Sequence, residues 1–173
     1  VEKFVQEDKL DIVIYNRGIG GFVTQELLDN IDVCILDLAP RRLFINIGTN
    51  DLSDPAISIE DMIANYDKIL TIVQDKLPDI DIYMMAYYPI NYDAATEEMK
   101  PCLLIRTNDK IAQANEAVRT LAKAHHAHYI DINAPLKDEQ GNLKAEYTIE
   151  GMHIKEQGYR AIFDSFIKYA LED

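Results

Sequence analysis

The chain alternates between short runs rich in β-branched residues and longer segments with helical periodicity, and this alternation constrains its fold most. Strands are expected at residues 11–15, 43–47, 80–86 and 128–132, and helices at residues 24–38, 59–77, 104–121 and 159–170. Strands separated by helices of about ten or more residues form βαβ units around a mostly parallel sheet. The sequence therefore predicts an α/β fold of three layers with a flavodoxin-like parallel sheet.

Length, charge and cysteine content exclude several classes of protein. A chain of 173 residues predicts one domain spanning residues 1–173. Its net charge of −13 argues against nucleic acid, whose phosphates need clustered cations, and against an anionic membrane surface. No apolar run approaches the roughly 18 residues of a membrane span, and no leader opens the chain. Cys34 and Cys102 lack CxxC spacing and suit reduced thiols in the cytoplasm. The acidic net charge is compatible with a small-molecule substrate. The sequence does not decide whether the protein forms a homo-oligomer.

Three loops follow the carboxyl ends of expected strands, where ligands gather in such sheets. They are Gly18–Gly21, Gly48–Asp51 and Tyr87–Tyr92, and we expect them at one edge of the sheet. The glycine loop lacks both GxGxxG spacing and a P-loop lysine, so it is either a tight turn or a backbone donor to an oxyanion. Asn50 is either the centre of an Asx-type turn or a neutral amide donor to the same oxyanion.

A carboxylate lies three residues before a histidine in Glu150-Gly-Met-His153. Such an acid can fix the tautomer of the ring and stabilise the imidazolium, although a loop histidine with no role is the alternative. His125, His126 and His128 cluster at an expected helix end, where favourable charge is the simpler explanation, so no metal site is predicted.

No serine occupies the strand-to-helix elbow of a nucleophile, and G-x-S-x-G is absent. Ser58 is expected to cap a helix, Ser165 lies in the last helix, and Ser53 lies beyond the Asn50 loop. Cys102 is a weaker candidate, since only Lys100 and Arg106 nearby would lower its pKa.

Taken together, these motifs resemble the SGNH hydrolases, also called GDSL esterases and lipases, over essentially the whole chain. Asn16–Phe22 matches the glycine block, which assigns the oxyanion donor to Gly21. Asn50 matches the asparagine block, and Glu150–His153 matches the last block, with His153 as the base and Glu150 in place of the usual Asp. The segments Tyr147–His153 and Ile105–Asn108 look most like bacterial proteins similar to platelet-activating-factor acetylhydrolase.

The resemblance implies hydrolysis of a small acyl ester, with acetyl favoured because no extended apolar lid is visible, and without a metal or organic cofactor. Tyr88 and Tyr92 would contact the substrate, either by stacking on a sugar or by lining an acyl pocket. The family's Gly-Asp-Ser block, on a strand between those at residues 11–15 and 43–47, is absent. We expect the domain to be N-terminally truncated, so that an upstream segment or another chain supplies this strand. A non-catalytic remnant or binding module is the alternative, and a flavodoxin-type nucleotide binder ranks last.

Overall fold

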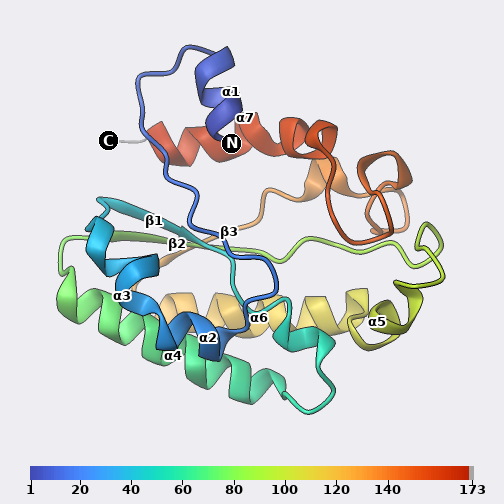
Figure 1. Ribbon diagram of the computed structural model, residues 1–173, viewed down its shortest axis with the longest axis horizontal. Helices are drawn as coiled ribbons and strands as arrows, with labels where there is room; N and C mark the ends of the chain where they lie inside the picture. The colour runs from blue at the N-terminus through green and yellow to red at the C-terminus, as the bar shows by residue number, and fades with distance from the viewer. Residues whose placement is uncertain (172–173) are drawn as a thin grey trace.

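The computed structural model describes residues 1–171, in which helices cover both faces of a three-stranded parallel sheet (Figure 1). The strands are β1 (Arg42–Ile45), β2 (Asp81–Met85) and β3 (His128–Ile130). The α-helices are α1 (Glu2–Glu7), α2 (Thr24–Asp29), α3 (Ile31–Cys34), α4 (Ile59–Lys76), α5 (Lys100–Ile105), α6 (Asn108–Ala124) and α7 (Glu156–Leu171). Four 3₁₀ turns complete the elements, η1 (Leu36–Leu38), η2 (Asp51–Ser53), η3 (Ala134–Leu136) and η4 (Ala145–Tyr147).

The sheet has the order β1-β2-β3, and both pairs of strands are parallel. Arg42 is opposite Asp81 in the first pair, and Tyr83 is opposite His128 in the second. The three strands fall inside residues 43–47, 80–86 and 128–132, except that β1 begins one residue early. The predicted α/β class is therefore confirmed.

The side chains of β2 point alternately to the two faces of the sheet and so contribute to two separate core layers. Ile82 and Met84 point into the layer beneath α4 and α6, whereas Tyr83 and Met85 point into the layer beneath α1 and α7. Figure 1 shows α4 and α6 on one side of the sheet and α1 and α7 on the other. Because both faces are covered, β2 is apolar on both sides, as parallel strands usually are.

The strand expected at residues 11–15 is not formed. The segment keeps the alternation of a strand, since Ile12 and Ile14 are half-buried while Val13 and Tyr15 are exposed. A strand, however, is defined by hydrogen bonds to a neighbour, and none pairs with this segment within residues 1–171. The predicted strand is therefore wrong for these residues, which keep the alternating burial of a strand without its pairing.

Two expected helices are each divided. Residues 24–38 form α2, α3 and η1, because the backbone leaves helical geometry at Asn30 (φ −120°), whose side chain donates to the carbonyl of Glu26. Residues 104–121 are divided at Arg106, and a new helix begins where the hydroxyl of Thr107 accepts from Lys110 N. Side-chain caps of this kind satisfy helix ends and favour a break over continuation.

Candidate active site

The three predicted loops meet at one edge of the sheet. The hydroxyl of Tyr87 donates to the carbonyl of Ile47 at 2.6 Å, which joins the third loop to the residue directly before the second. Gly48 has a φ of +114°, and a Cβ at this position would lie 2.4 Å from the Tyr87 hydroxyl, so only glycine fits beneath this contact. Burial raises the pKa of Tyr87 well above its usual value, which keeps the hydroxyl protonated as a donor.

A buried carboxylate ties the glycine loop to the asparagine loop. Asp51 is 2% exposed and accepts hydrogen bonds from both the backbone N–H and the hydroxyl of Thr24, the residue that begins α2. The neighbouring Asn50 donates from Nδ2 to the carbonyl of Phe22 at 2.9 Å. Because an amide nitrogen carries two hydrogens, one N–H of Asn50 is left to point at a ligand.

Gly21 lies directly before Phe22 and has a φ of +86°. Its region is exposed, and nothing lies within 4 Å of the place a Cβ would occupy. The structure thus brings Gly21 and Asn50, the two predicted oxyanion donors, to adjoining segments of chain.

Glu150 and His153 form a hydrogen-bonded pair. The ring Nδ1 lies 2.6 Å from Glu150 Oε1, and the backbone N–H of His153 donates to the same oxygen at 2.8 Å. Since a carboxylate only accepts, Nδ1 carries the hydrogen and the neutral ring presents a lone pair on Nε2. The side chain of His153 is 68% exposed, whereas that of Glu150 is 13% exposed. The ring is therefore fixed at Nδ1 by Glu150, and Nε2 is open to a ligand.

The loop that carries this pair is shaped by Gly151 and Thr148. Gly151 has a φ of +93°, and its carbonyl accepts from Asn91 N at 2.7 Å. Thr148 accepts from Gly151 N and donates to the carbonyl of His153. The histidine loop is in this way fastened to the loop after β2.

Arg106 is a central residue of the site that the sequence patterns did not single out. Its Nη2 donates to Asn50 Oδ1 at 3.1 Å, its Nε to Ser53 Oγ at 2.7 Å, and its Nη1 approaches Met152 Sδ at 2.8 Å. One guanidinium therefore connects the asparagine loop to the residue before His153. In the sequence it stood out only as a cation near Cys102 and as part of the segment Ile105–Asn108, and neither feature predicts a contact with Asn50.

None of the serines and cysteines of the described chain is hydrogen-bonded to the His153 ring. Ser53 accepts from Arg106 and from Cys102 Sγ, and Ser58 caps α4 in a capping box with Asp61. Ser165 lies in α7. Within residues 1–171 the His153 ring is hydrogen-bonded to Glu150 and to no serine or cysteine.

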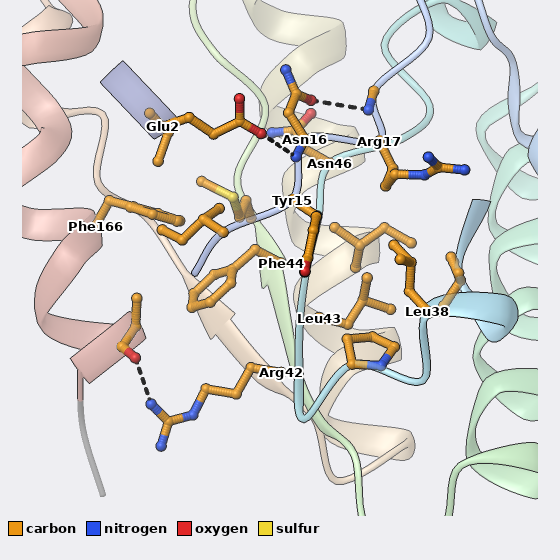
Figure 2. A pocket seen from close by; sticks show the side chains of 18 of the residues that line it. Glu2, Tyr15, Asn16, Arg17, Leu38, Arg42, Leu43, Phe44, Asn46 and Phe166 are labelled. Atoms are coloured by element: carbon orange, nitrogen blue, oxygen red, sulfur yellow. Dashed lines mark hydrogen bonds between the residues drawn. The ribbon is translucent and has the colours of Figure 1, made fainter. Parts of the chain in front are cut away.

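A groove of about 1140 Å³ runs along the edge of β1 that faces away from β2. In Figure 2, Tyr15 and Asn16 lie across from Leu43 and Phe44 of β1, and Phe166 of α7 lies alongside. No strand within residues 1–171 pairs with this edge. The groove lies between segments 12–17 and 42–47, which are the two that the resemblance places on either side of the absent strand.

The two tyrosines expected to contact substrate lie in different settings. Tyr88 lines the groove and packs edge-on against Tyr159 with ring centroids 6.3 Å apart, and burial raises its pKa. Tyr92 is 39% exposed, and Lys100 Nζ lies 5.9 Å from its ring centroid.

The histidine cluster is divided between different surroundings. His125 bridges α6 to α4 through contacts with Gln74 and Asp67, and the ring of His128 stacks on Tyr83. No group of three potential metal ligands occurs in the described part of the chain. Nor does any helix within residues 1–171 have the length and apolarity to cross a membrane.

Residues 3–161 match the model of the GDSL-like lipase/acylhydrolase family. Among solved structures, a platelet activating factor protein of Streptococcus pneumonia is 31% identical with a TM-score of 0.85, over 97% of this chain and 77% of that one. An acetylxylan esterase of Geobacillus stearothermophilus has the same fold at 16% identity, with a TM-score of 0.75 over 99% and 78% of the two chains.

A curated relative, the N-acylneuraminate cytidylyltransferase of Escherichia coli O18:K1:H7, is 26% identical over 153 residues. The match covers 88% of this chain but only 34% of that protein, so the chain spans about a third of the length of the curated relative. The family match, by contrast, extends over nearly all of the chain. The chain therefore belongs to the GDSL-like lipase/acylhydrolase family.

Proposed function

We propose that the chain forms the histidine, acid and oxyanion-binding parts of a carboxylic ester hydrolase that acts on small acyl esters, acetyl esters in particular. The observation that carries the proposal is the Glu150–His153 pair, in which Nδ1 is held at 2.6 Å and Nε2 is open. This is the arrangement a histidine needs to take a proton from an attacking hydroxyl.

The attacking hydroxyl is a serine on a strand that occupies the groove beside β1. A parallel strand there would pair with the edge of β1 and would be covered by apolar side chains from both core layers. The groove reaches Phe22 and Ile47, and the carbonyl of Phe22 is the group that holds the Asn50 amide. A serine at the carboxyl end of such a strand would therefore lie beside the oxyanion donors.

In the proposed reaction His153 Nε2 takes the serine proton as the serine oxygen bonds to the carbonyl carbon. The carbonyl oxygen becomes negative and accepts hydrogen bonds from Gly21 N and Asn50 Nδ2. The C–O bond to the alcohol then breaks, and the alcohol leaves with the proton from His153. Water, activated in the same way, releases the acid and restores the serine.

An acylated sugar is the substrate class that we favour. The acetylxylan esterase with the same fold and the sugar-acid substrate in the name of the curated relative both support it. The exposed ring of Tyr92, on the loop bonded to the histidine loop, is suited to stacking on a sugar. The free thiols of Cys34 and Cys102 support a cytoplasmic location.

A second candidate is a non-catalytic binding module of the same fold. The observation in its favour is that no serine or cysteine within residues 1–171 is bonded to His153. In that case the oxyanion donors would bind an acyl ester or a carboxylate without turnover.

The test is hydrolysis of p-nitrophenyl acetate by two forms of the protein. One consists of these residues alone, and the other, the strand-bearing protein, has an added N-terminal strand that ends in Gly-Asp-Ser. We expect turnover only with the strand, stoichiometric labelling of its serine by a fluorophosphonate, and loss of both in His153→Ala. His126→Asn is the matched control, because it removes an exposed imidazole whose positive φ of +53° asparagine tolerates. Binding of acetate without turnover by the strand-bearing protein would support the binding module instead.

A further inference from the structure

Arg106 is a buried cation in neutral surroundings. The residue is only 6% exposed, yet its three hydrogen-bond partners are an amide oxygen, a hydroxyl and a thioether. Arginines that are buried to this degree usually pair with a carboxylate, because a buried charge without a counter-charge is costly. Within residues 1–171 no carboxylate forms an ion pair with Arg106, although the chain contains 30 acidic residues.

The surroundings of Arg106 leave its charge uncompensated in the free protein. Burial lowers the pKa of its guanidinium, and the one side chain that acts in the opposite direction is the thiol of Cys102 rather than a carboxylate. A site that keeps an uncompensated buried cation is prepared to stabilise a negative charge that arises during the reaction or arrives with a ligand. In the proposed reaction, the negative charge that develops is that of the oxyanion, which Asn50 would bind.

Asn50 is the link between Arg106 and that oxyanion. Arg106 Nη2 donates to Oδ1 of the amide, and this contact fixes which end of the amide is oxygen and which is nitrogen. With Nδ2 bonded to the carbonyl of Phe22, the amide is held at both ends. A cation on Oδ1 also withdraws electron density from the amide, which makes the remaining N–H of Nδ2 a stronger donor.

The same guanidinium reaches the histidine loop through Met152 Sδ. Its three contacts join segments that are 46 to 56 residues away in sequence. The oxyanion donor and the base therefore share one support, and displacement of Arg106 would change the separation of the two.

We propose that Arg106 is a positioning residue that orients the Asn50 amide and polarises it as the oxyanion donor, with its buried charge acting as the counter-charge of the transition state. The catalytic part of this inference rests on the ester hydrolysis proposed above. The contact between Arg106 and Asn50 does not, and it can be tested without turnover.

The first test is NMR of the ¹⁵N-labelled full chain, observing the two Nδ2 protons of Asn50, which are assigned by their loss in Asn50→Asp. We expect the Nδ2 proton that is bonded to the carbonyl of Phe22 to exchange with solvent about tenfold or more slowly than the Nδ2 protons of the exposed Asn16, because Arg106 holds the amide in the orientation that makes this bond. Arg106→Met should shift the signals and remove this protection, whereas Arg106→Lys should restore part of it. Arg119→Met, which removes an exposed cation of α6, should leave the signals unchanged.

If Arg106→Met does not fold, Arg106→Gln decides with the same measurement, since it keeps a donor without the charge. Absence of protection for both Nδ2 protons of Asn50 in the unmodified protein, or signals unaffected by Arg106→Met, would overturn the proposal. Neither result depends on whether the protein hydrolyses esters.

The second test uses the strand-bearing protein and p-nitrophenyl acetate. Arg106→Met should lower kcat about 10- to 100-fold with KM nearly unchanged, less than the roughly 100- to 1000-fold typical when a donor itself is removed. In an Asn50→Ala background the same substitution should cost less than about threefold, because the group through which Arg106 acts is gone. An equal loss in both backgrounds would show that Arg106 acts elsewhere. Absence of turnover by the unmodified strand-bearing protein would count against the proposed function and leave the NMR result to decide the role of Arg106.

Discussion

Gly151 is the position where a single methyl group should disturb the histidine loop most. Its φ is +93°, and a Cβ there would lie 2.4 Å from the carbonyl oxygen of Asn91 and 2.9 Å from Ala95 Cβ. The strained backbone of a non-glycine residue costs about 1–3 kcal/mol, and overpacking costs about 1–3 kcal/mol more. Gly151→Ala should therefore lower the free energy of unfolding by about 4 kcal/mol.

The size of this effect makes it easy to measure. Against a total stability of about 5–15 kcal/mol, the loss should lower the urea midpoint clearly. For a chain of this length it corresponds to a fall in Tm of about 8–16 °C. The displaced loop should also lose the hydrogen bond from Asn91 N to the Gly151 carbonyl, so esterase activity of the strand-bearing protein should fall as well.

Substitutions at two other glycines separate the cost of backbone strain from the cost of overpacking. Gly141 has a φ of +85° with nothing within 4 Å of the place a methyl group would occupy, so Gly141→Ala should show only the backbone strain of about 1–3 kcal/mol. Gly20 has neither feature, and Gly20→Ala should change stability by less than about 0.5 kcal/mol. If Gly151→Ala costs no more than Gly141→Ala, the close approach to Asn91 contributes nothing and the reasoning is refuted.

Three further predictions concern other parts of the site. Asp51→Ala should lower the free energy of unfolding by about 2–5 kcal/mol in urea titrations, because it leaves two buried donors of Thr24 without an acceptor. Stability should fall above about pH 10, because burial raises the pKa of Tyr87 in the folded chain and the unfolded chain therefore ionises first. Tyr87→Phe should reduce the slope of that fall by up to about 1.36 kcal/mol per pH unit in pH-dependent unfolding. Glu150→Gln should lower kcat/KM of the strand-bearing protein by about tenfold to thousandfold, since the amide no longer fixes the tautomer of His153, and an unchanged rate would remove Glu150 from the mechanism.

The elements predicted well from the sequence are those that depend on local pattern. The apolar run of β2 and the stripe of α4 located both elements to within a few residues, and Ser58 caps α4 as expected. The hydrogen bond from His153 to Glu150 could also be predicted from the sequence, because the two residues are only three positions apart and a tight glycine turn brings their side chains together.

What the sequence could not predict depends on pairing across long distances in the chain. Residues 11–15 have the alternation of a strand, but whether they form one depends on a neighbour rather than on their own pattern. Arg106 is similar, because its partners Asn50, Ser53 and Met152 are 46 to 56 residues away. No local spacing connects an arginine after a short helix to an amide in a loop so distant.

The groove beside β1 also has a consequence for how the protein behaves at high concentration. An edge without a strand neighbour in residues 1–171, beside apolar side chains, is a template on which a second molecule can add β-structure and begin to aggregate. The opposing force is the net charge of −13, which makes molecules repel one another. Salt shortens the range of that repulsion to about 10 Å at 0.1 M. A protein made of these residues alone should therefore self-associate more readily as ionic strength rises. A strand that fills the groove would remove the template, so the same segment that supplies a nucleophile would also protect the protein from self-association.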